Sequence, residues 1–211
     1  MWFSTKTSHK LMLLKKKLGK SRICRKCKTE LETPAHVLIH CTHTGNKTTA
    51  RHNRILELVA DFLRSRDLDV DVDISPTEVY SKQRPDLIIR NHRLKLTAIL
   101  DLKVSFDLEK NFERNREDNK NKYELLSVEL CRKARYDTFL DVLNIGLLGS
   151  WDPKNEKGLK IIGLNKIDIK NLSFIMLKAA VNDAHQTFIN HIRAPKVNKP
   201  DLPIQPPPAQ P

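Results

Sequence analysis

The amino-acid sequence predicts an α/β domain built on a mixed sheet and preceded by a small metal-binding segment. Helical and strand patterns follow one another in the order helix, three strands, helix, strand, which is typical of an α/β core rather than a helical bundle. Two apolar runs, 87–89 and 94–104, are joined by turn-prone residues and predict a hairpin. Three of the four cysteines are crowded with histidines between residues 24 and 41, which indicates metal ligation rather than disulfides.

Length, composition and charge limit the class of protein. The chain has 211 residues, of which 39% are hydrophobic and 30% charged, enough for one medium domain with a small satellite. Its 38 lysines and arginines exceed its 25 acidic residues by 13, so a polyanion such as nucleic acid is the expected partner. No apolar run approaches the ~20 residues that span a bilayer, and no secretory signal is evident, so no membrane partner is expected. No sequence feature indicates an oligomeric state.

A basic arm is expected over residues 1–22, where lysines surround a short apolar run at 11–14. Two interpretations of this arm stay open. One is a solvated tail and the other is a segment that contacts phosphate groups, and we expect a mixture of the two.

A zinc knuckle is expected over residues 23–46. Cys24 and Cys27 have the two-residue spacing at which a tight turn presents two thiolates to one ion. His36 and Cys41, four residues apart, can complete a tetrahedral site for Zn²⁺. A segment this small has no core of its own, so the metal would supply its folding energy.

The surroundings of these four ligands leave one choice open. His40 and His43 could each replace a ligand, so the fourth position is less certain than the first two. Basic residues sit between the ligands, and Arg25 and Lys26 are expected to contact nucleic acid.

An amphipathic helix is expected over residues 49–66. At 100° per residue, Arg51 and His52 flank its apolar face in the first turn and should border a functional site at the edge of the sheet. Glu57 lies nearly opposite that face and should point to solvent. The apolar face is formed by Ile55, Leu58, Val59, Phe62 and Leu63.

The predicted hairpin brings three reactive side chains together. Asp86 stands at the entrance of its first run, whereas Asp101 and Lys103 share one face of the second run because side chains alternate along a strand. Two carboxylates and an amine on neighbouring strands can bind Mg²⁺ through oxygen ligands and hold a water beside it. The strand before the hairpin, over 67–74, alternates acidic and apolar residues and should be half-buried with an acidic outer face.

The register of the hairpin decides whether the carboxylates meet. A tight turn at residues 91–92 would leave Asp101 about 13 Å along the strand from the residue opposite Asp86, too far for a shared ion. A turn centred near residues 93–94, or a bulge, would place Asp86 directly opposite Asp101.

The second half of the chain supplies further helices, a strand and a tail. Lys122 lies on the border of the inner face of the next helix, and Cys131 is expected to be buried in that helix. Residues 194–211 hold seven of the eleven prolines, which predicts an extended, disordered tail. The expected elements are a helix over 112–136, a strand over 142–148, a short helix near 156–163 and a helix over 168–192.

The order and spacing of these motifs resemble the C-terminal end of site-specific non-LTR retrotransposon polyproteins. Elements of this ribosomal-DNA-inserting kind carry a restriction-like endonuclease with a PD-(D/E)xK active site. The resemblance covers roughly residues 22–192. It rests on the zinc knuckle, Arg51-His52-Asn53, Arg84-Pro85-Asp86, Asp101-Leu102-Lys103, Lys122-Tyr123 and the later Gly149-Ser150-Trp151 with Pro153 and Asn155.

The resemblance implies a restriction-endonuclease-like core over residues 48–193 (helix, mixed-sheet hairpin, helix, strand) that nicks DNA with Mg²⁺. Asp86 and Asp101 would hold the ion, and Lys103 or Lys122 would orient or deprotonate the attacking water. Both lysines stay open as the catalytic one. Arg51 and His52 would contact the scissile phosphate, with helix capping and surface charge as the alternative.

The resemblance also implies partners and a place in the cell. The nick would prime reverse transcription, so target DNA and element RNA are the expected partners, in the nucleus. No Tyr-x-Asp-Asp polymerase motif occurs, so we expect a fragment or degenerate copy of a longer polyprotein. The competing hypothesis is a catalytically inactive, nucleic-acid-binding remnant.

Overall fold

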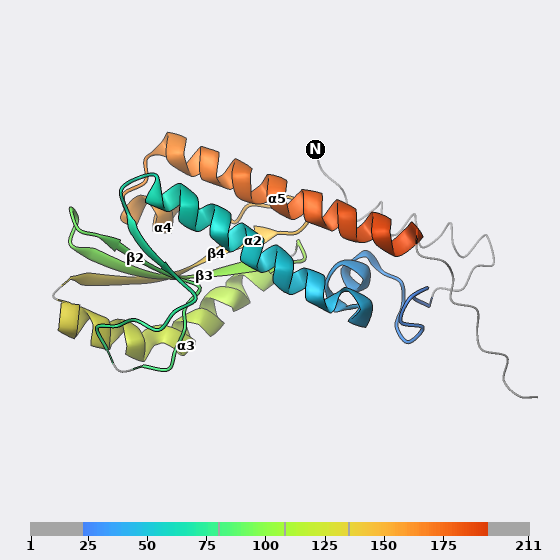
Figure 1. Ribbon diagram of the computed structural model, residues 1–211, viewed down its shortest axis with the longest axis horizontal. Coiled ribbons are helices and arrows are strands. Elements are labelled where there is room, and N and C mark those ends of the chain that lie inside the picture. The colour runs from blue at the N-terminus through green and yellow to red at the C-terminus, as the bar shows by residue number, and fades with distance from the viewer. Residues whose placement is uncertain (1–22, 80, 108, 135, 194–211) are drawn as a thin grey trace, which may run out of the picture.

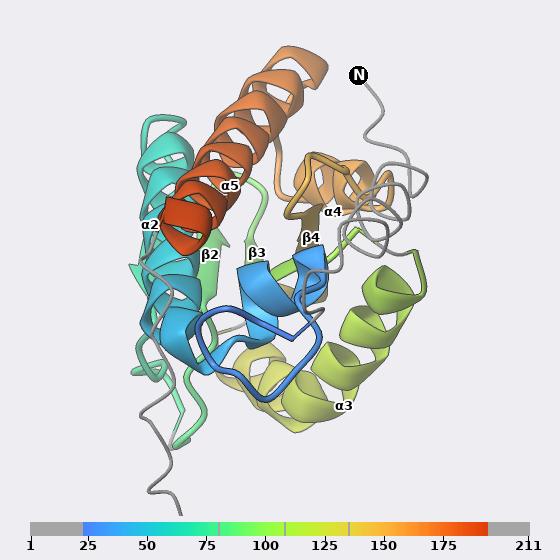
Figure 2. The ribbon, with the colours of Figure 1, turned by 90° about the vertical axis from the view of Figure 1, so that its right-hand side faces the viewer.

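Helices cover both faces of a central sheet in the computed structural model (Figure 1). The structure describes residues 23–79, 81–107, 109–134 and 136–193, so the predicted basic arm and proline-rich tail lie outside the described residues. Figure 2 shows one helix at the lower right of the sheet and the other helices to its left and above it. The single helix is α3 (Glu109–Ala134), and the opposite layer contains α2 (Gly45–Arg64), α4 (Asn155–Ile161) and α5 (Lys166–Arg193).

The predicted mixed sheet is confirmed. Its order is β1-β2-β3-β4, with antiparallel pairing from β1 to β3 and parallel pairing between β3 and β4. Parallel neighbours need a long crossover, and α3 supplies it. The strands are β1 (Asp69–Val72), β2 (Leu87–Asn91), β3 (Leu96–Ser105) and β4 (Asp137–Gly146).

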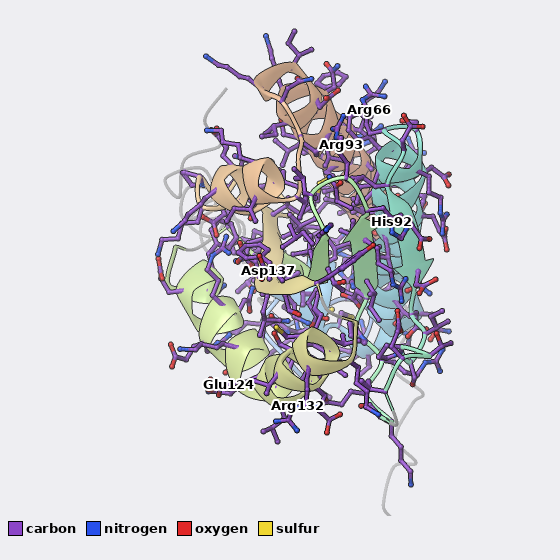
Figure 3. All side chains as sticks on the ribbon, turned by 90° about the vertical axis from the view of Figure 1, so that its left-hand side faces the viewer. Arg66, His92, Arg93, Glu124, Arg132 and Asp137 are labelled. Atoms are coloured by element: carbon purple, nitrogen blue, oxygen red, sulfur yellow. The ribbon has the colours of Figure 1, made fainter. Side chains whose placement is uncertain are left out.

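The hairpin turn centres on residues 93–94, the position required for the two carboxylates to meet. Leu87 pairs with Leu100, and the same register puts Asp86 opposite Asp101. Figure 3 faces the turn end of the molecule, with His92 and Arg93 of the turn and Asp137 at the start of β4. The carboxylate pair therefore lies at the other end of β2, away from the turn.

Alternation of side chains divides strand β3 between two cores. Leu100 and Leu102 pack into the large core that also contains residues of α2 and α5. Ile99 packs with Tyr123 of α3 on the opposite face. Asp101 has the same parity as Ile99, so it emerges on the α3 face, surrounded by that helix and the strands.

Two residues expected in the core lie on the surface. Leu58 is 37% exposed, because α2 packs against α5 as well as the sheet and its buried stripe turns toward Leu56 and Ala60. Cys131 is also exposed, since it follows the buried Leu130 and points away from the sheet. The strands differ in length from prediction as well: β1 is shorter, and β4 starts earlier, at Asp137.

The predicted metal-binding segment packs directly onto the helical layer. It contains a π-helical turn, η1 (His36–His40), and a short 3₁₀ turn, η2 (Thr42–Thr44), which leads into α2. Leu38 packs with Leu147 and with Ala184 of α5. None of the helices in the described residues combines the length and apolar character needed to cross a bilayer.

Candidate active site and metal centre

Two carboxylates meet where β2 begins beside β3. Asp86 directly precedes β2, and its backbone amide donates a hydrogen bond of 3.3 Å to Oδ1 of Asp101. In return, the amide of Leu102 donates a bond of 2.7 Å to Oδ2 of Asp86. These reciprocal bonds hold the predicted pair of carboxylates beside each other across the strands.

His52 reaches the first of these carboxylates from α2. Its Nε2 lies 3.1 Å from Oδ2 of Asp86 and 3.1 Å from the carbonyl oxygen of Leu102. The bond to Asp86 raises the pKa of His52, although burial opposes this. Burial disfavours the charged form of Asp86, but the bonds from His52 and the Leu102 amide outweigh it and lower the pKa of Asp86. The Asp86 carboxylate is therefore held in its ionised form.

Both candidate lysines approach the same oxygen of Asp101. This side chain is 2% exposed, and its Oδ2 lies 2.9 Å from Nζ of Lys103 and 3.9 Å from Nζ of Lys122. Lys122 comes from α3 and is the more exposed of the two. The neighbouring Tyr123 donates its hydroxyl to the carbonyl of Arg84 at 3.2 Å, and burial together with Asp101 raises the pKa of that hydroxyl.

The groups gathered here fit a divalent cation that prefers oxygen ligands. Asp86 and Asp101 each supply carboxylate oxygens at the same end of the strands, and the Leu102 carbonyl shares the His52 imidazole with Asp86. The histidine on one carboxylate and the lysines on the other show that this end of the sheet attracts positive charge. Mg²⁺ is compatible with this donor set.

Arg51 lies away from this site, against expectation. Its side chain is buried, and Nη2 donates a hydrogen bond of 3.1 Å to the carbonyl of Leu38. Successive residues of a helix point about 100° apart, so His52 faces the sheet while Arg51 faces the space between α2 and α5. Glu57 is exposed, as predicted.

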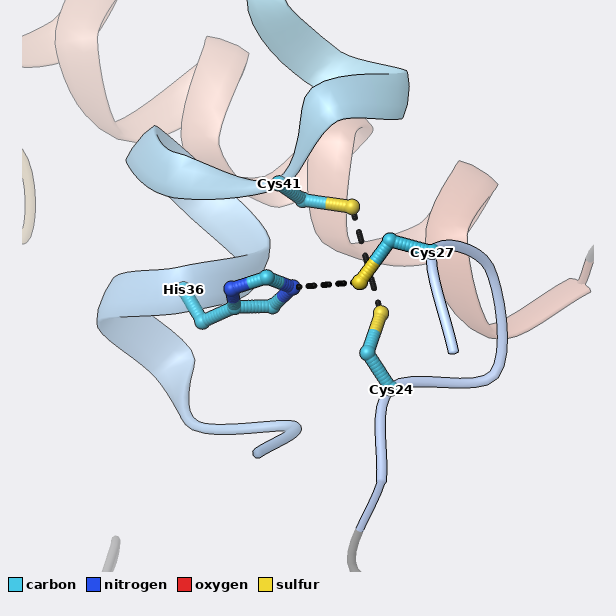
Figure 4. Close-up of side chains that lie close together, drawn as sticks. All are labelled: Cys24, Cys27, His36 and Cys41. Atoms are coloured by element: carbon cyan, nitrogen blue, oxygen red, sulfur yellow. Dashed lines mark hydrogen bonds between the residues drawn. The ribbon is translucent and has the colours of Figure 1, made fainter. Parts of the chain in front are cut away.

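The four predicted zinc ligands converge at the start of the described chain (Figure 4). Their ligand atoms all lie within 4.8 Å of one another. The sulfurs of Cys24 and Cys41 are 3.9 Å apart, and the sulfur of Cys27 lies 3.3 Å from Nε2 of His36. A tetrahedral zinc site with Zn–S near 2.3 Å and Zn–N near 2.0 Å has edges of about 3.6 to 3.8 Å. The cluster therefore fits a tetrahedrally coordinated ion such as Zn²⁺.

Local structure selects among the three histidines. His36 opens η1, is buried, and has its amide bonded to the hydroxyl of Thr33 at 3.1 Å. His40 and His43 are exposed and lie outside the cluster. Of these three histidines, His36 is therefore the one that the fold places in the cluster.

The thiols of the cluster differ in acidity. Burial raises the pKa of Cys24 to about 11. Burial also disfavours the thiolate of Cys27, but hydrogen bonds from the hydroxyl of Thr29 and from nearby backbone amides lower the pKa of Cys27 to about 6. The thiolate is the form that binds a metal, so Cys27 is prepared for ligation.

The sequence analysis missed two residues beside the cluster. His191, in the last turn of α5, places Nε2 3.6 Å from the sulfur of Cys24 and 3.7 Å from Oε2 of Glu32. Together with Cys24 they form a second group of potential ligands. Arg25 already pairs with Glu32 at 2.8 Å and donates to the carbonyl of Ile192. His191 therefore lies next to Cys24 without belonging to the group of four, and no sequence signal links residues so far apart.

Arg25 and Lys26, the two residues of this segment predicted to contact nucleic acid, differ in how far their side chains are already engaged within the protein. The guanidinium of Arg25 is engaged by Glu32 and by the end of α5, so it holds the segment onto that helix. Lys26, the next residue, is half-buried. Its positive charge contributes to lowering the pKa of His191, after the larger effect of burial.

Comparison with known proteins adds little to this picture. No protein-family model and no curated protein sequence matches the chain. Among solved structures, the chain is similar to one described as "Structure and function of phenuiviridae cap snatching endonucleases", with 14% identity and a TM-score of 0.40. The match covers 68% of this chain and 65%, slightly less than two thirds, of that chain. A likeness this distant assigns no activity.

Proposed function

We propose that the chain is a Mg²⁺-dependent DNA endonuclease of the PD-(D/E)xK type. The observation that carries this proposal is the pair Asp86 and Asp101. The amide of Asp86 bonds to the Asp101 carboxylate, the amide of Leu102 bonds to the Asp86 carboxylate, and Lys103 lies on the buried carboxylate of Asp101. The order of helix, hairpin, helix and parallel strand supports a restriction-endonuclease-like core. The motifs of the chain resemble those of retrotransposon polyproteins. On that basis the proposed role is to nick nuclear target DNA, so that the nick primes reverse transcription. Element RNA is then a further partner.

Each side chain at the site has a distinct task in this proposal. Bound Mg²⁺ would stabilise the negative charge that builds on the phosphate and acidify a bound water. Asp86 and Asp101 hold the ion through their oxygens. Lys103, the closer of the two lysines, orients the attacking water, whereas the more exposed Lys122 faces the incoming phosphate. His52 positions Asp86 and leaves its carboxylate ionised.

The proposal is tested by nicking of supercoiled plasmid with zinc-loaded protein. Nicked circles should accumulate when Mg²⁺ is supplied and should be absent when Mg²⁺ is omitted. Omission is a cleaner control than EDTA, because EDTA would also remove zinc from the cysteine cluster. Protein that binds DNA but never nicks it at any Mg²⁺ concentration would instead support the inactive, nucleic-acid-binding remnant.

Binding to DNA should depend steeply on salt. The chain carries a net charge of +13, so most of its affinity should come from release of counterions from the phosphates. We expect affinity to fall by about 1,000-fold between 50 and 200 mM salt, with little dependence on sequence. Removing residues 1–21, which are rich in lysine, should make the salt slope shallower. Fluorescence anisotropy with short duplexes measures both, and an affinity independent of salt would contradict the expectation.

Replacing His52 by alanine should reduce nicking far more than stability. The imidazole orients Asp86, so we expect a loss of about 100-fold in rate, measured on plasmid. The side chain is 29% exposed, so the free energy of unfolding should fall by no more than about 1 kcal/mol. His185→Ala, at an exposed position of α5, is the matched control and should change neither property. Equal losses of rate and stability in His52→Ala would indicate a structural role only.

A further inference from the structure

A basic groove lies between α2 and α5, apart from the site formed by Asp86 and Asp101. It is a cavity of about 230 Å³. Three cations of α2 line it at helical spacings of three and four residues, which place them on one face. One carboxylate and polar side chains of α5 face them. The residues that define this basic groove are Lys47, Arg51, Arg54, Asp183, Gln186 and Asn190.

Arg51 is the unusual member of the basic groove. It is 2% exposed, and among the described residues only Nη2 has a partner, the carbonyl of Leu38. Nε and Nη1 are buried with no hydrogen-bond partner in that part of the chain. Burial lowers the pKa of Arg51, and the charge of Asp183 opposes this effect only in part. Buried donors of a charged group that lack partners are costly, so proteins seldom keep them without a reason.

The carboxylate in the groove is already committed elsewhere. Asp183 pairs with Arg54 at 2.7 Å, and Arg54 also donates to the carbonyl of Ala179. The single carboxylate of the groove therefore faces three cations, so the described lining keeps an excess of positive charge. This excess disfavours a metal cation as the ligand and favours an anion.

The donor geometry narrows the class of anion. A guanidinium presents its N–H groups as a planar fork that matches two oxygens of a phosphate. We propose that the basic groove binds a backbone phosphate of nucleic acid, distinct from the phosphate cut at Asp86 and Asp101. The nucleic-acid source of this phosphate rests on the proposed function. Arg51 and His52 are consecutive in α2 but face the groove and the sheet respectively. The helix would therefore contact the nucleic-acid backbone at two of its faces.

The Arg51→Met variant tests the groove, with DNA affinity measured without Mg²⁺ so that nicking plays no part. We expect affinity to fall at least about 10-fold and the slope of log affinity against log salt to decrease by about one. Thermal stability should stay equal or rise, because the substitution removes a buried charge that lacks partners. Arg51→Lys keeps the charge without the fork and should bind with intermediate affinity. Lys170→Met is the control, because Lys170 is exposed on α5 outside the groove. Its DNA affinity should fall by less than a third of the fold-change seen for Arg51→Met.

Inorganic phosphate provides the second arm of the test. Millimolar phosphate should raise the melting temperature of the wild-type chain at constant ionic strength and should not raise that of Arg51→Met. If Arg51→Met has a lowered melting temperature but unchanged DNA affinity and an unchanged phosphate response, Arg51 only stabilises the fold through its bond to the Leu38 carbonyl. That result would overturn the proposal. A phosphate response combined with unchanged DNA affinity would identify a site for a free anion and overturn the assignment to nucleic acid. A chain that never nicks but loses affinity in Arg51→Met would refute the nuclease while supporting the groove.

Discussion

Replacing Asp86 or Asp101 by asparagine should each abolish nicking, with the rate reduced at least about 1,000-fold. An uncharged amide oxygen binds a divalent cation more weakly than a carboxylate, because it carries no negative charge. Asp86 bonds to the Asp101 carboxylate through its amide and accepts a bond from the Leu102 amide, so the loss of either aspartate removes half of a single site. The rate of conversion of supercoiled to nicked plasmid under excess Mg²⁺ measures the effect.

The same two variants should keep their fold and their affinity for DNA. Asparagine has nearly the shape of aspartate, and its amide oxygen can still accept the bond from the Leu102 amide at position 86. Asp137→Asn is the matched control, because Asp137 is exposed at the start of β4, at the turn end of the sheet (Figure 3). It should nick at the wild-type rate. An Asp101→Asn variant that nicks within about threefold of wild type would exclude Asp101 from the active site.

Purified protein should contain one zinc ion per chain, and Cys24→Ser should lose it. Cys24 and Cys41 lie 3.9 Å apart in the cluster, so removing one sulfur leaves three ligands and a strongly reduced affinity. Residues 23–43 should then unfold locally, since this segment depends on the ion for its folding energy. The sheet and its core should remain folded, because they are built from other residues. Metal analysis and amide hydrogen exchange measure the two effects.

Loss of zinc should also loosen the end of α5. His191 contacts Cys24, and Arg25 donates to the carbonyl of Ile192, so the segment and the last helical turn support each other. Exchange should therefore accelerate in the last turn of α5 as well as in the segment itself. Cys131→Ser, an exposed thiol of α3, is the control and should keep its zinc. Native protein prepared without chelators that contains no zinc would contradict the assignment.

Local patterns predicted most of the secondary structure and singled out the residues that the fold brings together in the two candidate sites. The spacing of Cys24, Cys27, His36 and Cys41 is short enough that local turns alone bring the four together. The alternation of strand β3 likewise predicted that Asp101 and Lys103 would share a face, because that relation depends only on the period of a strand. In contrast, the register of the hairpin depends on the turn, and the sequence left two turns open until the structure placed the turn at residues 93–94.

Contacts between distant elements could not be predicted from spacing. Arg51 and His52 seemed equivalent at the border of one apolar stripe, yet the packing of α5 against α2 buries Arg51 and leaves His52 facing the sheet. Leu58 is exposed for the same reason. The contact of His191 with Cys24 joins residues 167 apart in sequence, and no local pattern encodes such a pair.

Binding of Mn²⁺ to the acidic site tests the central claim most directly. Mn²⁺ accepts the same oxygen ligands as Mg²⁺ and reports its free concentration by electron paramagnetic resonance. Zinc-loaded wild-type protein and Asp137→Asn should bind Mn²⁺ with equal affinity. Asp86→Asn and Asp101→Asn should each bind it at least about 10-fold more weakly. Equal binding by wild type and Asp101→Asn, or no binding by the wild-type chain, would contradict the assignment of these two carboxylates as a metal site.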